Sequence, residues 1–334
     1  MPIKYFFAEK KRKTMAKVFI TQKIPNAAIE YLQSHGIDAI MRNEVFPLSK
    51  NDLKNNIKNA DVVICLLTDI IDQEIIDFAV DNGVKGFCNY AVGYNNIDVN
   101  YAKKRNIWVT NTPGVLTKTT AEMAWALLFS AARRIVEAHK FILDGKFRGW
   151  EATLLLGYDV SGKTLGIIGA GRIGTAFALM SAGFEMNVLY VDENTNSILE
   201  EKLNAKKVDL DTLLKKSDFI SLHTPLTPET KYLINKDKFN LMKPNAILIN
   251  TSRGTVINEK DLAEALKSKK IAYAGLDVFE NEPLIEKELL NLGNVVLAPH
   301  IASGTKETRD NMAIMAAKNA VDIIQTKKPQ NNVY

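Results

Sequence analysis

The fold is decided by one stretch of the chain, TLGIIGAGRIG at residues 164–174, in which an apolar run leads into the glycine pattern G-x-G-x-x-G. In such a pattern Gly169 permits a tight turn out of a strand, Gly171 lets the backbone approach a pyrophosphate, and Gly174 lets the next helix pack closely on the sheet. The unpaired N–H groups and the dipole of that helix stabilise negative charge at its N-terminus. The stretch therefore predicts a strand, a turn and a helix that together bind a dinucleotide.

A carboxylate, Asp192, ends the next apolar run and bears on which dinucleotide binds. An acid at the end of a second strand can accept hydrogen bonds from the adenosine ribose hydroxyls, and it repels the 2′-phosphate of NADP. No Lys or Arg follows Asp192 before Lys202. The sequence therefore favours NAD, as NADH, over NADP. The alternative interpretation of Asp192 is a solvated acid in a loop, where acids are common.

Length and composition place the chain among ordinary globular proteins. Its 334 residues are enough for two domains, and 46% of them are hydrophobic and 24% charged. The most apolar helical stretch, around residues 123–132, is followed by two arginines and is shorter than a membrane span, so no membrane segment is expected. Cys65 and Cys88 lie in apolar segments without metal-ligand spacing, which favours reduced thiols in a cytoplasmic protein and no metal site.

The positive charge of the chain is concentrated at its start. Residues 1–14 contain five basic side chains and one acid, a net charge of +4 out of +5 for the whole chain. This segment lacks the apolar core of a secretory signal. We interpret it as an upstream extension or an alternative start rather than as a basic arm, and no nucleic-acid partner is expected.

Short apolar runs alternate with helical patterns in two successive series, which indicates two parallel sheets. The expected strands are residues 17–21, 37–41, 61–67, 84–88 and 107–109 in the first series, and residues 164–168, 187–191, 219–222, 246–250, 272–276 and 295–298 in the second. The predicted fold class is therefore α/β, with two doubly wound parallel-sheet, Rossmann-like domains.

Two long helical patterns flank the second series. A capping-box pattern, TTAE at residues 119–122, predicts one long helix to about residue 143, and a second helical pattern covers about residues 305–325. We expect the second helix to pack back on the first domain. This gives a discontinuous substrate-binding domain of residues 1–117 and 303–334, and a nucleotide-binding domain of residues 118–302.

Three polar motifs follow strands of the second series. Arg253 lies in TSRG, Glu282 in ENEP and His300 in PHIAS. The carboxyl ends of parallel strands meet at one edge of a sheet, where ligands of such sheets bind. The three side chains can therefore converge on the nicotinamide end of the cofactor.

Reduction of a 2-oxo acid requires these residue types. A hydride that reaches a ketone carbon builds negative charge on the oxygen, and the imidazole of His300 can donate a proton to that oxygen near neutral pH. The carboxylate of Glu282 would orient the imidazole. The forked guanidinium of Arg253 would bind the carbonyl oxygen and one carboxylate oxygen, a geometry that lysine cannot reproduce.

Each of these residues also has an ordinary interpretation when it is taken alone. A histidine after a strand is often structural, an arginine in such a loop is usually on the surface, and Glu282 lies in an acidic turn. His223, in HTPLT, could line the adenosine side of the cofactor crevice or simply end its strand. The joint occurrence of Arg253, Glu282 and His300 behind a nucleotide motif favours catalysis.

The motifs of residues 166–303 resemble those of the cofactor domain of the D-isomer-specific 2-hydroxyacid dehydrogenases, which share G-x-G-x-x-G, HTPLT, TSRG, the E-x-E-P turn and PHIAS. Upstream, NYAVGYNNID at residues 89–98 and NTPGVLT at residues 111–117 are similar to the substrate loop and hinge of the glyoxylate and hydroxypyruvate reductase branch. The D-lactate dehydrogenase branch usually has an arginine in that first loop, which this chain lacks.

The resemblance implies an active site in the cleft between two domains that close over the substrate. It assigns substrate binding to Leu67, Val92, Gly93, Arg253 and His300. It assigns cofactor binding to Thr117, Gly169, Gly171, Arg172, Ile173, Gly174, Asp192, His223, Thr224, Pro225, Thr251, Asp277 and Ala302. It also implies a homodimer, in which Trp150 reaches the active site of the partner subunit or serves as an interface or core aromatic residue.

The activity that the resemblance implies is NADH-dependent reduction of glyoxylate to glycolate and of hydroxypyruvate to D-glycerate. Several glyoxylate reductases carry basic residues after the second strand and use NADPH, so the branch alone does not decide the nucleotide. The alternatives are another enzyme of the family, acting on phosphoglycerate, phosphite or D-lactate, and an NADH-sensing interaction protein like the related corepressors.

Overall fold

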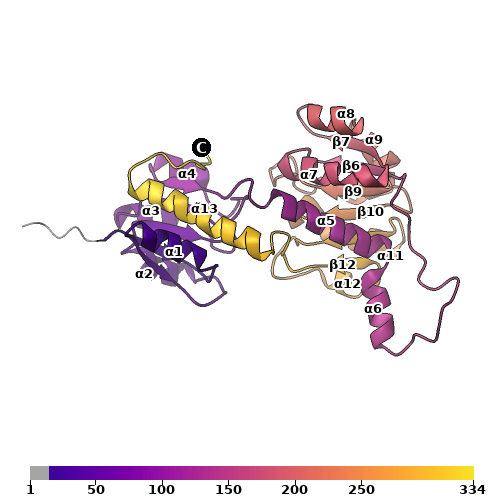
Figure 1. Ribbon diagram of the computed structural model, residues 1–334, viewed down its shortest axis with the longest axis horizontal. Helices are drawn as coiled ribbons and strands as arrows, with labels where there is room; N and C mark the ends of the chain where they lie inside the picture. The colour runs from indigo at the N-terminus through magenta and orange to yellow at the C-terminus, as the bar shows by residue number, and fades with distance from the viewer. Residues whose placement is uncertain (1–14) are drawn as a thin grey trace, which may run out of the picture. The chain divides into compact units, whose positions relative to one another are not determined.

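The computed structural model describes residues 15–334, which separate into two compact units (Figure 1). Unit 1 is the chain up to Pro113 together with Arg309–Tyr334, and unit 2 is Gly114–Thr308. The prediction of a basic extension at residues 1–14 lies outside the described residues. Within residues 15–334, no helix is long and apolar enough to cross a membrane, and no group of His, Cys, Asp and Glu side chains could hold a metal ion.

Unit 1 contains a five-stranded parallel sheet with the strand order β2-β1-β3-β4-β5. The strands are β1 (Lys17–Ile20), β2 (Asp38–Met41), β3 (Val62–Cys65), β4 (Gly86–Asn89) and β5 (Trp108–Thr110). Every residue of β3 and β4 is buried, because central parallel strands are covered by helices on both faces. The order is that of flavodoxin-like doubly wound sheets.

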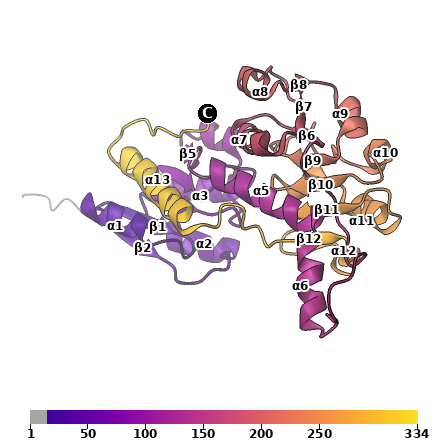
Figure 2. The same ribbon diagram turned by 45° about the vertical axis from the view of Figure 1, so that its right-hand side comes forward.

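The helices of the described part of unit 1 are α1 (Ala27–Ser34), α2 (Lys50–Ile57), α3 (Gln73–Asp81), α4 (Val99–Lys104) and most of α13 (Lys306–Ile324). The helices α2, α3 and α4 pack their apolar residues into one core. The C-terminal helix α13 lies beside α1 in both views, with the Lys318 ammonium 5.8 Å from the Tyr31 ring centroid (Figures 1 and 2). The chain thus returns to unit 1 at its end.

Unit 2 contains a seven-stranded parallel sheet with the order β12-β11-β10-β9-β6-β7-β8. The strands are β6 (Thr164–Ile168), β7 (Asn187–Val191), β8 (Lys206–Lys207), β9 (Phe219–Leu222), β10 (Ile247–Asn250), β11 (Tyr273–Leu276) and β12 (Val295–Leu297). The chain leaves β6 toward β7 on one side and later returns to β9 on the other. The crevice for a ligand is therefore expected at the carboxyl ends of β6 and β9.

Helices cover both faces of the second sheet. One core contains residues of α5 (Thr117–Ala132), α7 (Arg172–Met180) and α8 (Ser197–Leu203), and the other contains residues of α9 (Leu210–Lys216), α10 (Lys236–Leu241) and α11 (Glu259–Lys267). The Trp125 indole N–H donates to the Phe177 carbonyl at 3.0 Å, which ties α5 to α7. The short helix α12 (Lys287–Leu290) precedes β12.

The two predicted parallel sheets are confirmed, with strand ends within a few residues of the prediction and β8 as an additional edge strand. The predicted long helix is wrong. It is divided into α5 and α6 (Ile135–Leu143) at Arg134, whose φ of 52° is left-handed and cannot continue a helix. The capping box is also wrong, because α5 begins after Leu116 and the Thr119 hydroxyl bonds to that of Thr308 at 2.6 Å.

Candidate active site

The glycine turn lies at the switch point of the seven-stranded sheet. Gly169 has a left-handed φ of 92°, and a Cβ atom there would lie 2.8 Å from the backbone of His223 and Thr224 at the end of β9. Only glycine fits this turn. A Cβ atom at Gly171, the N-cap of α7, would meet nothing within 4 Å. The backbone before α7 is therefore open to a ligand.

Asp192 follows β7 and its carboxylate faces the glycine turn. One oxygen accepts the Ala170 N–H at 2.7 Å, and the other accepts the Asn194 N–H at 3.1 Å. The two bonds fix the carboxylate beside the turn and leave lone pairs for further donors. The arrangement places a negative charge where the ribose of a dinucleotide would lie.

Three buried polar atoms near the same edge lack a hydrogen-bond partner among the residues the structure describes: Nδ1 of His223, Oγ1 of Thr224 and Oγ1 of Thr251. They follow β9 and β10 directly. Buried polar atoms are almost always bonded, so these three indicate a polar ligand. Together with the open backbone before α7, they fit a nicotinamide dinucleotide.

His223 is held as a neutral side chain. Its Nε2 atom lies 2.9 Å from the Ser221 hydroxyl, and its ring packs 5.1 Å from that of Phe177. Burial lowers the pKa of His223 to about 3. A proton donor for a substrate is therefore not expected at this position.

The place of Arg253 is determined by a close contact between two loops. A Cβ atom at Gly254 would lie within 2.0 Å of the Phe279 carbonyl group, so only glycine lets the loop after β10 pack on the backbone that leads to Glu282. The Arg253 Nη1 group donates to the Ser252 carbonyl at 2.7 Å. Burial lowers the pKa of Arg253 and the Glu282 carboxylate opposes this, which shows that the two side chains are within electrostatic reach.

Glu282 and His300 form a direct pair. The Nδ1 atom of His300 lies 2.8 Å from Oε2 of Glu282, and the side chains remain 31% and 36% exposed, respectively. Oε1 of Glu282 accepts the Phe279 N–H at 3.0 Å. Burial acts to raise the pKa of Glu282, but the His300 and Phe279 hydrogen bonds and the charge of Arg253 outweigh it, so the pKa is lowered. The carboxylate stays ionised and acts as the acceptor for His300.

The loop that carries His300 is held by Asp277. His300 has a left-handed φ of 54°, a conformation that costs about 1–3 kcal/mol in a non-glycine residue. The fully buried Asp277 carboxylate accepts the N–H groups of Ile301 at 2.8 Å and Ala302 at 2.7 Å. Burial raises the pKa of Asp277 against these two bonds. The bond between Asp277 and Ala302 therefore helps to hold the loop that carries His300. Both residues are also expected from the sequence to line the cofactor.

The other predicted site residues lie at the starts of helices or in loops that follow strands. Arg172 and Ile173 begin α7, Thr117 begins α5, and Pro225 lies in the loop after β9. In unit 1, Leu67 follows β3, and Val92 and Gly93 follow β4. The carbonyls of Val92 and Gly93 accept the side-chain amides of Asn111 and Asn89, respectively, at 2.8 Å, which fixes the peptide group that follows each of these two residues.

Asn196 holds the glycine turn in place, a role that the sequence analysis did not predict. The Asn196 amide donates to the Ala170 carbonyl at 2.8 Å and to the Thr175 hydroxyl at 2.7 Å, while its oxygen caps α8. It thereby ties the glycine turn to the segment after Asp192. An Asn before a helical pattern is a cap signal, but nothing in the sequence indicates its second role.

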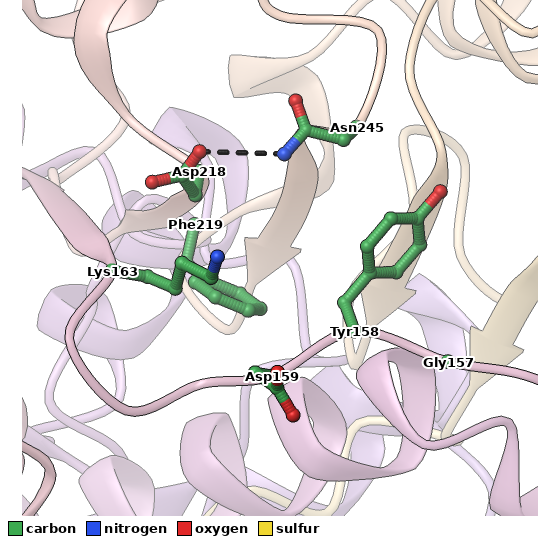
Figure 3. Close-up of a pocket in the computed structure, with 7 residues that line it drawn as sticks. All are labelled: Gly157, Tyr158, Asp159, Lys163, Asp218, Phe219 and Asn245. Carbon is green, nitrogen blue, oxygen red and sulfur yellow. Dashed lines mark hydrogen bonds between the residues drawn. The ribbon is translucent and has the colours of Figure 1, made fainter.

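A separate cavity of about 200 Å³ lies in unit 2 (Figure 3). Its lining residues Lys163, Asp218 and Asn245 precede β6, β9 and β10, so the cavity is at the amino edge of the sheet. The Asn245 amide donates to Asp218 at 3.3 Å within it. None of the predicted site residues lines this cavity.

A glycine turn at the switch point, with an acid, an imidazole and a guanidinium after neighbouring strands, defines a dinucleotide-dependent oxidoreductase. Residues 125–302 match the family model of the D-isomer specific 2-hydroxyacid dehydrogenase, NAD binding domain. The chain belongs to this family. Its unit 2 binds a nicotinamide dinucleotide.

Known proteins similar to the whole chain agree with this assignment. A glyoxylate reductase of Thermococcus litoralis is 47% identical over 321 residues, which cover 95% of this chain and 96% of that protein. The crystal structure of a glyoxylate reductase from Paecilomyes thermophila is 32% identical with a TM-score of 0.84, covering 96% of this chain and 98% of that one. An NADPH-dependent glyoxylate/hydroxypyruvate reductase from Sinorhizobium meliloti, in complex with NADP and malonate, is 28% identical with a TM-score of 0.83, covering 96% and 97%.

Proposed function

We propose that this protein reduces small 2-oxo acids with NADH, converting glyoxylate to glycolate and hydroxypyruvate to D-glycerate. The observation that carries the proposal is the 2.8 Å contact of His300 with Glu282, in electrostatic reach of Arg253. The names of the relatives in Thermococcus litoralis and Sinorhizobium meliloti support the substrate class.

His300 is the proton donor in this proposal. An ionised carboxylate only accepts hydrogen bonds, so Nδ1 of His300 carries the hydrogen that Glu282 accepts. Nε2 then faces the substrate and protonates its carbonyl oxygen as the hydroxyl forms, which leaves a neutral imidazole. When bound, the reduced nicotinamide supplies the hydride that adds to the carbonyl carbon.

Arg253 binds and polarises the substrate. Its guanidinium donates to the carbonyl oxygen and to one carboxylate oxygen, and it stabilises the negative charge that develops on the carbonyl oxygen. In unit 1 the peptide N–H groups of Val92 and Gly93, with Leu67 nearby, are proposed to hold the substrate carboxylate. The Ala91 carbonyl, which shares a peptide group with the Val92 N–H, accepts the Thr112 N–H at 2.8 Å. The Val92 carbonyl, which shares one with the Gly93 N–H, accepts the Asn111 amide at 2.8 Å, so both donors are preorganised.

The cofactor is proposed to be NADH rather than NADPH. Asp192 is held beside the glycine turn by the Ala170 N–H, so its charge opposes a 2′-phosphate. The pyrophosphate is assigned to the N-terminus of α7, at Arg172 and Ile173. The Sinorhizobium meliloti relative is NADPH-dependent, so the preference depends on Asp192 rather than on the family.

A homodimer is also proposed, through the segment 135–158, here called the arm. It contains α6, none of whose residues is buried and which projects from the rest of unit 2 in both views (Figures 1 and 2). The large exposed apolar residues of the arm are Ile135, Val136, Ile142, Leu143, Phe147, Trp150, Leu156 and Tyr158. Such a surface favours a protein partner, and a second copy of the chain fits the proposal that Trp150 of one protomer reaches the active site of the other.

The experiment that tests this function is NADH oxidation by the purified protein with a panel of 2-oxo acids. We expect turnover with glyoxylate and hydroxypyruvate, and weaker turnover with pyruvate. Oxidation of glycolate and D-glycerate by NAD should be measured in parallel. An absence of turnover with every acid, while NADH still binds, would favour the alternative of an NADH-sensing interaction protein.

A further inference from the structure

Glu259 is a buried carboxylate that bonds to the segment containing Glu282. The proposed reaction does not use it. It is the first residue of α11 and is 5% exposed. Its Oε1 atom accepts the Glu280 N–H at 2.5 Å, and its Oε2 atom accepts the Glu286 N–H at 3.3 Å. These two donors lie on either side of Glu282 in the chain. One side chain thus holds both ends of the segment 280–286.

The contact between Glu259 and this segment is reciprocal. Oε2 of Glu280 accepts the Glu259 N–H at 3.4 Å, which occupies a donor that the start of a helix leaves free. The Tyr232 hydroxyl donates to the other Glu280 oxygen. Between the two attachment points the segment is exposed to solvent, and the exposed fraction of Leu284 is 73%. The attachments therefore determine where the exposed part of the segment lies.

We propose that Glu259 is a positioning residue for the reaction, holding the segment 280–286 so that the Glu282 carboxylate meets Nδ1 of His300. This inference rests on the proposed function of the Glu282–His300 pair. Glu259 itself lies behind the segment and acts through two peptide groups. The Phe279 N–H, which bonds to Oε1 of Glu282, adjoins the same peptide that Glu259 holds.

The position requires a carboxylate rather than an amide. Two N–H donors approach the two oxygens, and a glutamine would turn its own NH2 group toward one of them. Burial raises the pKa of Glu259, and the charges of Glu280 and Glu286 act in the same direction, whereas the two N–H groups oppose them. A buried charge at this place is costly, and its two hydrogen bonds offset that cost.

The experiment is a double-mutant cycle between Glu259→Gln and Glu282→Gln. A merely structural role of Glu259 would lower stability and leave the rate of the folded enzyme unchanged. Because a displacement of about 1 Å can cost about 100-fold in rate, we expect E259Q to lower kcat by about 10- to 100-fold. NADH affinity, measured by fluorescence quenching, should change less than twofold. In the E282Q background E259Q should have little further effect, since its action passes through Glu282.

A further variant, with two controls, keeps the test independent of folding defects in E259Q. Glu286 has a φ of −55°, which proline can adopt, so Glu286→Pro removes the N–H that Glu259 accepts and leaves Glu259 intact. We expect E286P to lower kcat as E259Q does. Glu286→Ala, which keeps the N–H, and Glu264→Gln, an exposed carboxyl on the same helix, should retain wild-type kcat.

The outcomes separate this inference from the proposed function. If E259Q and E286P keep kcat within twofold of the controls, or if the effects of E259Q and E282Q simply multiply, Glu259 does not position Glu282. If E282Q itself keeps the wild-type rate, the proposed function of the pair fails, whatever E259Q does.

Discussion

Nδ1 of His300 and Oε2 of Glu282 lie 2.8 Å apart, although the two residues follow different strands of the seven-stranded sheet. The contact fixes which imidazole nitrogen carries hydrogen toward the protein, and so leaves Nε2 for the substrate in the proposed reaction. Glu282 is ionised, because its pKa is lowered by His300, Phe279 and Arg253 against the effect of burial. The pair therefore has the polarity of an oriented proton donor.

Replacing Glu282 tests this relationship. We expect Glu282→Gln to lower kcat/KM for glyoxylate by about 100-fold, because the imidazole loses the carboxylate that orients it as a proton donor. Steady-state NADH oxidation across a pH series measures the effect. Glu288→Gln, an exposed carboxyl in α12, is the matched control. Equal rates for E282Q and the control would remove Glu282 from the mechanism.

His223 gives a prediction about stability in acid. Its folded pKa of about 3 lies below the ordinary value of 6.5, so between these values the unfolded chain binds a proton that the folded chain does not. Stability therefore falls as the pH drops from about 6.5 toward 3, by at most about 1.4 kcal/mol per pH unit from this one group. Urea unfolding of the apoprotein at pH 7, 6 and 5 should show a smaller loss for His223→Gln than for wild type. Parallel losses in the two proteins would mean that His223 titrates normally.

Asp192 is predicted to set the nucleotide preference. Asp192→Ala removes a charged acceptor for the ribose hydroxyls, so the ratio of kcat/KM with NADH to that with NADPH should fall by about 10- to 100-fold. Both cofactors are assayed at fixed glyoxylate concentration. Glu193→Gln, the neighbouring exposed carboxyl, should leave the ratio unchanged. The ribose assignment is wrong if the ratio in D192A equals that of wild type.

The arm gives a prediction about assembly. In light scattering coupled to size exclusion, the wild type should have twice the chain mass of 37.2 kDa. Leu143, 72% exposed in the single chain, can be changed to Asp without disturbing the core of unit 2, and L143D should shift the mass to that of one chain. Lys140→Glu on the same helix should remain dimeric. A wild-type protein that elutes as a monomer at micromolar concentration would refute the proposed interface.

The sequence predicted those parts of the fold that depend on local patterns of residues. Alternating apolar runs located both sheets, and the glycine stretch located the strand β6 and the helix α7. The break of the long helix at Arg134 was not predictable, because arginine has no local preference for a positive φ. The threonine pattern at residues 119–122 was misleading for a similar reason, since Thr119 bonds to Thr308, far along the chain.

In the site, too, residues marked by local patterns were predictable, and residues that act through long-range contacts were not. Arg253, Glu282 and His300 could be proposed from residue type and from their places after strands. Asp277 was predicted only as a cofactor-binding residue, and Asn196 and Glu259 were not predicted at all, because all three act on backbone N–H or C=O groups that lie 20 or more positions away in the chain. A hydrogen bond between residues so far apart in the chain produces no recognisable spacing in the sequence. Only the fold identifies the donor or acceptor.

The central claim is that Arg253 acts on the substrate during reduction by NADH. The most direct test measures glyoxylate-dependent NADH oxidation and NADH binding together in the wild type, Arg253→Ala and Arg253→Lys. Loss of a preorganised donor to the developing oxyanion costs about 100- to 1,000-fold, so R253A should lose this much kcat/KM while binding NADH normally, and R253K should not restore the rate. Wild-type turnover by R253A, or a wild-type protein that binds NADH and reduces no 2-oxo acid, would contradict the account.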